Sequence, residues 1–225
     1  MNGTPVARAG RREQAVSIEE ITSTALAMID AQGLDALTMR GLADAIGVKP
    51  VTLYRYLPNK DAILAEVADR LWRELPPIDP AIIGWKGQIR AMWLQLFDLM
   101  LRHPYAVPLI ARGGAYSSTA GSDTAVMMGV LKDAGFTPEL AGEFMHAASA
   151  LVVGFAFAHL WQHQAQQGQG PALPAGDATR PPSALLEYAQ QIGPFTTEEF
   201  GQTLDLIVDG FAHELPVGPD CPMTT

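Results

Sequence analysis

The side chains best suited to contacting another molecule are concentrated in 24 residues, Leu37 to Lys60, which read LTMRGLADAIGVKPVTLYRYLPNK. An arginine such as Arg55 can grip O6 and N7 of a guanine together or bind a phosphate. Lysine, threonine and tyrosine side chains are frequent phosphate contacts. This chemistry predicts binding to nucleic acid.

The same stretch predicts two short helices joined by a tight turn. Thr38 can cap the first helix, and Gly47 can end it in the left-handed conformation. Pro50 fits the first turn of the second helix, whose inward side chains are Leu53 and Leu57. A helix this short is not stable alone, so its neighbours must hold it while its outer face stays exposed. This is the arrangement of a helix-turn-helix, in which the second helix enters the major groove of DNA.

These residues resemble the pattern of the tetracycline-repressor (TetR) family, L-T-x-R-x-L-A-x-x-x-G-V-x-x-x-T-L-Y-x-x-x-x-N-K. The chain most resembles the branch that includes the tetracycline repressor itself, and the close match covers roughly residues 17–75. The resemblance implies an all-α fold of about 9–10 helices, with an N-terminal three-helix DNA-binding domain and a larger helical domain for ligand binding and dimerisation. The matching positions are Leu37, Thr38, Arg40, Leu42, Ala43, Gly47, Val48, Thr52, Leu53, Tyr54, Asn59 and Lys60.

Three regions follow from this reading. Residues 1–16 are expected to be a flexible basic arm, either a plain tail or a strand that adds phosphate or minor-groove contacts. Residues 17–60 form the DNA-binding domain. Residues 61–225 form the regulatory, ligand-binding and dimerisation domain, with a connecting helix over 60–75 and a flexible loop over 164–182.

Charge is distributed unevenly between these regions. The whole chain carries a formal charge of −9, yet residues 1–60 have seven Lys/Arg and six Asp/Glu, a net charge of +1. The remainder therefore has a net charge of −10. An acidic body repels DNA, so only the N-terminal part permits contact.

Apolar periodicity and capping residues predict the other helices. Ser17 starts one that ends at Gly33, Thr137 starts another, and Thr197 is expected to cap the last. The predicted helices after the connecting helix span 85–102, 105–112, 123–134, 137–164, 183–192 and 197–215, with a loop over 113–122.

The resemblance assigns contacts to individual residues of the DNA-binding domain. It implies phosphate contacts for Thr38, Tyr54 and Lys60. The residues expected to face the groove are Arg40, Lys49, Pro50, Val51, Thr52 and Tyr56. Arg55 has the chemistry of a guanine reader, with phosphate binding as the alternative.

The family places aromatic and methionine side chains of the second domain around a ligand cavity, and apolar walls with a few polar groups are typical of such sites. Each of these residues could instead be plain core. His103 and His146 are the expected polar contacts, on the expectation that both lie in apolar surroundings. The predicted ligand-binding residues are Trp93, Phe97, Met100, His103, Tyr116, Met127, Met145, His146 and Phe155.

No metal site and no cofactor are predicted. His159 and His163 are four residues apart, but no acidic or cysteine partner accompanies them. Against the tetracycline repressor, which holds its drug as a magnesium chelate, Leu109 falls where the metal-binding histidine would be. The resemblance therefore does not extend to tetracycline binding.

The family also implies a homodimer formed by helices at about 137–164 and 197–215. Two heads about 34–36 Å apart can read both halves of a palindrome. The longest apolar run, Ala147 to Trp161, is shorter than the ~20 residues that span a bilayer. Together with a single cysteine, Cys221, and no signal-peptide pattern, this predicts a cytoplasmic protein with no membrane partner.

The predicted function is a ligand-responsive DNA-binding transcriptional regulator, a repressor released from a palindromic operator by a small apolar or aromatic effector. The alternatives are a helical small-molecule-binding protein without DNA binding, and an activator that uses the same helix-turn-helix. An enzyme is not expected, because the sequence has no nucleophile–base pair, phosphate loop or paired-carboxylate motif.

Overall fold

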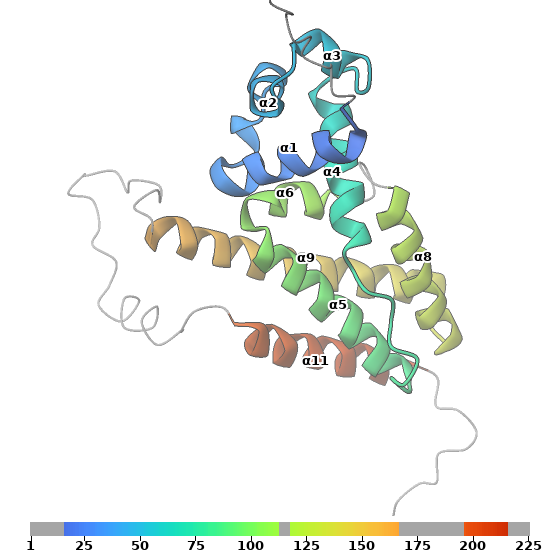
Figure 1. Ribbon diagram of the computed structural model, residues 1–225. Coiled ribbons are helices and arrows are strands. Elements are labelled where there is room, and N and C mark those ends of the chain that lie inside the picture. Colours follow the sequence, from blue (N-terminus) through green and yellow to red (C-terminus); the bar gives the residue numbers. More distant parts are fainter. Residues whose placement is uncertain (1–15, 113–117, 167–195, 216–225) are drawn as a thin grey trace, which may run out of the picture.

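The computed structural model describes residues 16–112, 118–166 and 196–215, and these are helical with no strand among them. Three helices form a head at one end, α4 runs from the head into a larger body, and α9 and α11 lie farther from the head (Figure 1). The predicted arm, most of the loop over 164–182, the helix at 183–192 and Tyr116 lie outside the described residues.

The head consists of α1 (Ile18–Gln32), α2 (Met39–Ile46) and α3 (Pro50–Tyr54), with a 3-10 turn η1 (Leu34–Ala36) after α1. The hydroxyl of Ser17 accepts a hydrogen bond from the backbone N–H of Glu20, which caps α1. Gly33 follows α1 with φ of 86°, and Gly47 ends α2 in the left-handed region. Caps and turns predicted from the sequence therefore define the helices of the head.

The connecting helix α4 (Lys60–Arg73) packs on α1 of the head and on α6 and α8 of the body. Asn59 caps it, because the Asn59 Oδ1 accepts a hydrogen bond from the backbone N–H of Ala62 at 2.8 Å. It ends at Arg73, two residues before the predicted end at residue 75, and its buried face contains Ile63 and Trp72.

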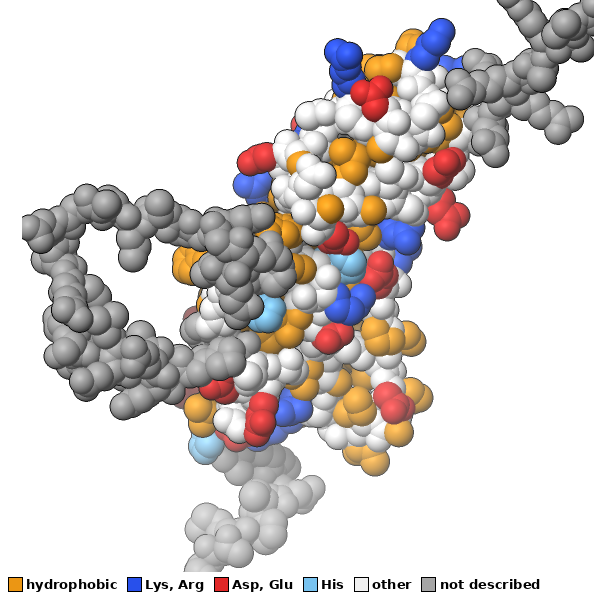
Figure 2. Space-filling model, turned by 60° about the vertical axis from the view of Figure 1, so that its left-hand side comes forward, with side chains coloured by type: hydrophobic (Ala, Val, Ile, Leu, Met, Phe, Trp, Pro, Cys, Tyr) orange, Lys and Arg blue, Asp and Glu red, His pale blue; other side chains and the backbone are white. Residues whose placement is uncertain are grey.

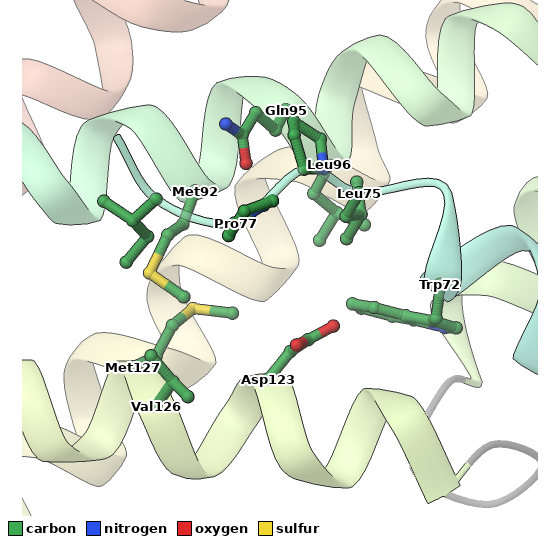
Figure 3. Close-up of a pocket in the computed structure, with 11 residues that line it drawn as sticks. Trp72, Leu75, Pro77, Met92, Gln95, Leu96, Asp123, Val126 and Met127 are labelled. Carbon is green, nitrogen blue, oxygen red and sulfur yellow. The ribbon is translucent and has the colours of Figure 1, made fainter. Parts of the chain in front are cut away.

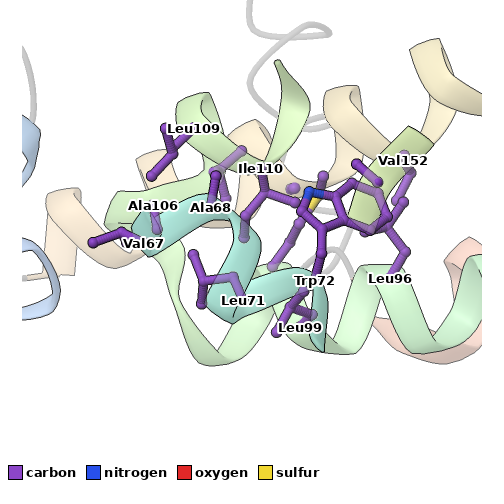
Figure 4. Close-up of a cluster of buried hydrophobic side chains, with 14 of the residues drawn as sticks. Val67, Ala68, Leu71, Trp72, Leu96, Leu99, Ala106, Leu109, Ile110 and Val152 are labelled. Atoms are coloured by element: carbon purple, nitrogen blue, oxygen red, sulfur yellow. The ribbon is translucent and has the colours of Figure 1, made fainter. Parts of the chain in front are cut away.

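The body contains α5 (Trp85–Arg102), η2 (Pro104–Ala106), α6 (Val107–Ala111), α8 (Ser118–Asp133), α9 (Pro138–Gln166) and α11 (Thr197–His213). Helix α9 contacts α5, α6, α8 and α11, so it is the central helix of the body. Side chains from α4, α5, α6 and α9 meet in one buried apolar cluster (Figure 4). This cluster makes the end of α4 continuous with the core of the body.

Two predicted helix starts were wrong. Helix α8 begins at Ser118, five residues before the predicted Asp123, so part of the predicted small-residue loop is helical. The cap of α11 is Thr196, whose hydroxyl accepts from Glu199 N–H while the Glu199 carboxylate accepts from Thr196 N–H. The capping-box spacing selects Thr196, because Glu199 lies three residues after it, whereas Phe200 lies three residues after Thr197.

Helix α9 has 29 residues, and its stretch Pro138–Gln162 is long and apolar enough to cross a membrane by length and composition. The fifteen-residue run seen in the sequence understated this, because the apolar stretch extends toward the N-terminus through Leu140, Phe144 and Met145. Only 28% of the most apolar part of that stretch is buried within the protomer. An apolar helix this exposed requires another apolar surface to cover it.

Candidate nucleic-acid interface and effector cavity

The outer face of the head is formed by side chains of α2, of α3 and of the residues that flank α3. In the same segment Leu42, Leu53 and Leu57 are buried, which turns the remaining positions outward. Val51 is 65% exposed and Tyr54 is 51% exposed, although both are apolar or aromatic. We define the outer face as the exposed set Arg40, Lys49, Pro50, Val51, Tyr54, Arg55 and Tyr56. Thr52, also predicted to contact DNA, is half-buried beside this set.

Electrostatics on this face favour an anionic partner. The Arg40 side chain is 88% exposed, and its Nε lies 4.0 Å from a carboxylate oxygen of Asp44, one turn later on α2. An exposed pair at that distance holds its partners only weakly, so Arg40 remains available. Basic side chains lie beside apolar ones at the tip of the head, and acidic side chains occur both near them and over the rest of the visible surface (Figure 2).

Two of the predicted phosphate-binding residues have structural bonds within the protomer. The Thr38 hydroxyl accepts from the backbone N–H of Gly41 at 3.0 Å and so caps α2. The Lys60 ammonium donates to the carbonyl oxygen of Leu34 at 2.9 Å, which ties the start of α4 to η1. Thr38 is exposed and keeps its hydroxyl proton as a donor, whereas Lys60 is half-buried.

A cavity of about 350 Å³ opens between the end of α4, the segment that follows it, α5 and α8. Its walls are almost entirely apolar, with Gln95 and Asp123 as the polar exceptions. In Figure 3 the carboxyl group of Asp123 points toward the indole ring of Trp72, and the thioethers of Met92 and Met127 lie close together. The lining residues are Trp72, Leu75, Pro76, Pro77, Ile78, Met92, Gln95, Leu96, Asp123, Val126 and Met127.

The carboxyl group of Asp123 lies among mostly apolar side chains. Burial raises its pKa above the ordinary value near 3.8, because a charged carboxylate loses hydration there. No hydrogen bond or ion pair to Asp123 is present among the described residues, and no neighbouring charge contributes to its pKa shift. The cavity thus holds one half-buried acid with no protein partner.

Most of the side chains predicted to line a pocket lie elsewhere. Of those in the described residues, only Met127 lines this cavity. Phe97 is fully buried and stacks on Phe200 with ring centroids 4.4 Å apart, while Phe155 packs edge-on against both rings. Trp93 and Met100 are also buried in the core, Met145 is half-buried, and His146 is exposed on α9.

The prediction that His103 lies in apolar surroundings was wrong. Its Nδ1 lies 2.9 Å from a carboxylate oxygen of Asp30 at the end of α1, and its Nε2 lies 3.6 Å from Glu74. Arg102 contacts the same Glu74 oxygen at 2.9 Å. His103 is therefore part of a charged cluster that joins the head, the end of α4 and the end of α5.

Comparison with known proteins agrees with this architecture. Residues 21–67 match the family model described as bacterial regulatory proteins, tetR family. The chain is 28% identical over 212 residues to the HTH-type transcriptional repressor DrrR1 of Streptomyces coeruleorubidus, a match that covers 87% of this chain and 77% of that protein. This chain belongs to the TetR family.

Solved structures of TetR-family proteins share the fold over nearly the whole chain. A possible TetR family transcriptional regulator from Streptomyces coelicolor A3(2) superposes with a TM-score of 0.73 at 24% identity, covering 88% of this chain and 100% of that one. The TetR family protein ActR of Streptomyces coelicolor, solved in complex with (S)-DNPA, gives a TM-score of 0.64 at 25% identity over 89% of this chain and 99% of that one. The head and body described above are thus those of a TetR-family fold.

Among the described residues, no group of three or more His, Cys, Asp or Glu side chains is placed to hold a metal ion. Leu109, at the position compared with the histidine of the tetracycline repressor, is buried in the apolar cluster around α4 and α6. The side chain of His163 lies outside the described residues.

Sequence reasoning missed the residues that build the cavity. Trp72 and Met92 lie within the helices predicted over 60–75 and 85–102 but have no predicted site role, and Asp123 is the predicted start of a helix. One signal was present: Asp123 is the single charged residue of the stretch Ala120–Val130. Its significance depends on α4 and α5, which pack against α8 from distant parts of the chain.

Proposed function

We propose that this protein is a ligand-responsive, DNA-binding transcriptional repressor that acts as a homodimer and that a small effector releases from its operator. The observation that carries the proposal is the outer face of the head. Tyrosine, valine, lysine and arginine side chains are exposed there together, on a five-residue helix that the buried Leu53 fixes in place. The family membership and the similarity to the repressor DrrR1 support the same function.

On this proposal, α3 lies in the major groove and Arg55 reads a base edge there, while Val51 makes apolar contact in the groove, for example with a thymine methyl group. Thr38 and Tyr54 contact phosphates and set the position of the head on the duplex. Lys60 contributes mainly by tying α4 to η1. Arg40, Lys49, Pro50, Thr52 and Tyr56 complete the interface.

The dimer would form through α9 and α11. On α9, Trp161 is 61% exposed, and no atom comes within 4 Å of a Cβ placed on Gly154. On α11, Leu206 is 74% exposed, and a Cβ on Gly210 is equally free of neighbours. Small residues beside large exposed apolar ones suit close packing of helices from a second copy.

Effector binding would reach the head through α4. The cavity is lined by Trp72 near the end of α4 and by the segment that follows it, so an occupant contacts the connecting helix directly. Two residues before Trp72 on the same helix, Arg70 donates a hydrogen bond to the Ser23 hydroxyl of α1 at 2.8 Å. A ligand that prefers one position of α4 would therefore shift the spacing of the two heads.

The charged cluster around His103 supplies a second link. Asp30 belongs to the head, Glu74 follows α4, and Arg102 and His103 end α5. Movement of the end of α4 would change the distances from Glu74 to both basic side chains. The cluster thus couples the position of α4 to the position of α1.

The experiment that tests the proposal is a mobility shift with purified protein and the DNA that flanks its own gene, followed by random-site selection, over a series of salt concentrations. We expect selective binding to two half-sites that weakens steeply with salt. Absence of selective binding in both formats, with the dimer intact, would contradict the proposal.

Two variants separate a repressor from a ligand-binding protein without DNA binding. Replacing Arg40 and Tyr54 together by alanine should abolish the shift and leave the dimer and the cavity intact. Arg73→Ala is the matched control, because Arg73 is an exposed arginine of α4 outside the outer face. A reporter gene under the operator distinguishes repression from activation by the sign of the change.

A further inference from the structure

We infer that the effector is an amphipathic cation, a compact apolar molecule with a protonated amine that pairs with Asp123 in the cavity between α4, α5 and α8. This inference rests on the proposed function, since it assigns a chemical class to the effector of that same protein.

The cavity contains one acid, Asp123. Asp123 extends from α8 into the cavity, with no protein hydrogen bond or ion pair among the described residues. Acids in apolar surroundings are ordinarily paired, because an unpaired charge loses its hydration without compensation. A cationic ligand would supply the missing partner, and a charge-assisted hydrogen bond is stronger than one between neutral groups.

The walls define the rest of the ligand. Trp72, Met92, Leu96 and Met127 offer aromatic, thioether and aliphatic surface, which favours an apolar body over a sugar or a peptide. A cation beside the carboxyl of Asp123 would also lie near the indole of Trp72, where attraction to the aromatic ring adds to binding. Methionine side chains adapt to irregular shapes, so the site suits several ligands of this class.

Other ligand classes fit these walls less well. An anionic ligand would meet the charge of Asp123, and no lysine or arginine lines the cavity to offset it. A bare metal ion would find one carboxylate and one amide, fewer protein ligands than metal sites ordinarily provide. A neutral apolar ligand would fill the space and leave the acid unpaired.

A matched set of three probes tests the inference on the full-length protein by isothermal titration calorimetry at neutral pH. The probes are 2-naphthylmethylamine, 2-naphthylmethanol and 2-naphthoic acid, which share one ring system and differ in charge. We expect the amine to bind at least about tenfold more tightly than the alcohol, and the acid to bind more weakly than either.

Two variants identify the acid that is responsible. Asp123→Asn keeps the shape of the side chain, and it should remove the preference for the amine while the alcohol binds as before. Asp133→Asn is the matched control, since Asp133 is an exposed acid on the same helix outside the cavity lining. This control should keep the full preference.

The inference is overturned if the alcohol or the acid binds as tightly as the amine, if Asp123→Asn retains the preference, or if the amine shows no binding at millimolar concentration. The mobility shift on the same protein separates the two proposals. Selective DNA binding without an amine preference would refute the effector class alone. An amine preference without selective DNA binding would refute the regulator and leave a cation-binding protein.

Discussion

All residues of the outer face of the head lie between positions 40 and 56 of the sequence. The cavity, in contrast, is lined by the end of α4, the segment after it, α5 and α8. The outer face is convex and exposed, and local caps and one short turn decide its shape. The cavity is concave, and the carboxyl group of Asp123 is distinctive only because the fold buries part of it there. A surface that binds an extended polymer can thus be encoded locally, whereas a site that encloses a small molecule requires long-range packing.

The largest effect should come from the side chain that holds the outer face in place. Leu53→Ala removes a fully buried side chain, and we expect a loss of about 2–5 kcal/mol in the free energy of unfolding together with loss of DNA binding. Val51→Ala, two residues away on the exposed side of α3, should change stability by less than about 0.5 kcal/mol. Chemical denaturation of both variants checks this, and equal losses would mean that α3 is not anchored by Leu53.

The next prediction tests whether the outer face reads bases. Arg55→Ala should weaken operator binding by about 1–3 kcal/mol and relax the preference at one base pair. Mobility shifts with single-base operator variants measure both effects. Arg55 instead contacts a phosphate if two results are found together. Binding then weakens uniformly for all operator sequences, and the slope of the logarithm of the binding constant against the logarithm of the salt concentration falls by about one.

A smaller effect is expected at the cap of α2. Thr38→Ala removes the acceptor for the Gly41 N–H and should lower the free energy of unfolding by about 1 kcal/mol. Thr38→Ser keeps the acceptor and should be close to wild type. An alanine variant as stable as wild type would show that α2 does not depend on this cap.

The smallest effect should come from Asp123 in the cavity, where substitution is expected to raise stability instead of lowering it. Burial raises the pKa of Asp123 in the folded protein, so the folded state disfavours the charged carboxylate. The resulting loss in the free energy of unfolding is fully present at pH values above both the unfolded and the folded pKa. Asp123→Asn should therefore raise Tm slightly at neutral pH. The gain should disappear as pH falls below the ordinary pKa near 3.8, where the acid is neutral in both states.

Thermal unfolding of both proteins over a pH series measures this difference. Asp133→Asn serves again as the control for general effects of removing an acid from α8. A gain that persists at low pH would show that the substitution acts through packing and not through charge. A cationic ligand should reverse the order at neutral pH by stabilising the protein with Asp123 more than the Asp123→Asn variant.

The sequence predicted the head in detail because its signals are local. The caps at Ser17, Thr38 and Asn59 act over three residues, and Gly47 needs only its own backbone conformation to end α2. The buried Leu42 and Leu53 follow from helical spacing. Helix α5 was also predicted with its observed bounds, since Gly84 precedes it and Pro104 follows it.

Local signals were insufficient where partners are distant. The cap of α11 is a different case, because the spacing of Thr196 and Glu199 marks it in the sequence itself, whereas Thr197 has Phe200 at the matching position. Phe97 was predicted to face a ligand, but Phe200 stacks on it from more than 100 residues away. His103 was expected in apolar surroundings, but the fold brings Asp30 and Glu74 to it.

By itself, then, the sequence determined the helix-turn-helix, the residues of its outer face, and the all-helical body with its long apolar helix. Helix periodicity and capping depend on neighbours within about one turn, and those neighbours are visible in the chain. Only the tertiary structure decided which aromatic and methionine side chains are core and which border a cavity. It also decided that Asp123 has no hydrogen-bond or ion-pair partner in the described part of the chain, because burial and pairing depend on helices that meet only when the chain is folded.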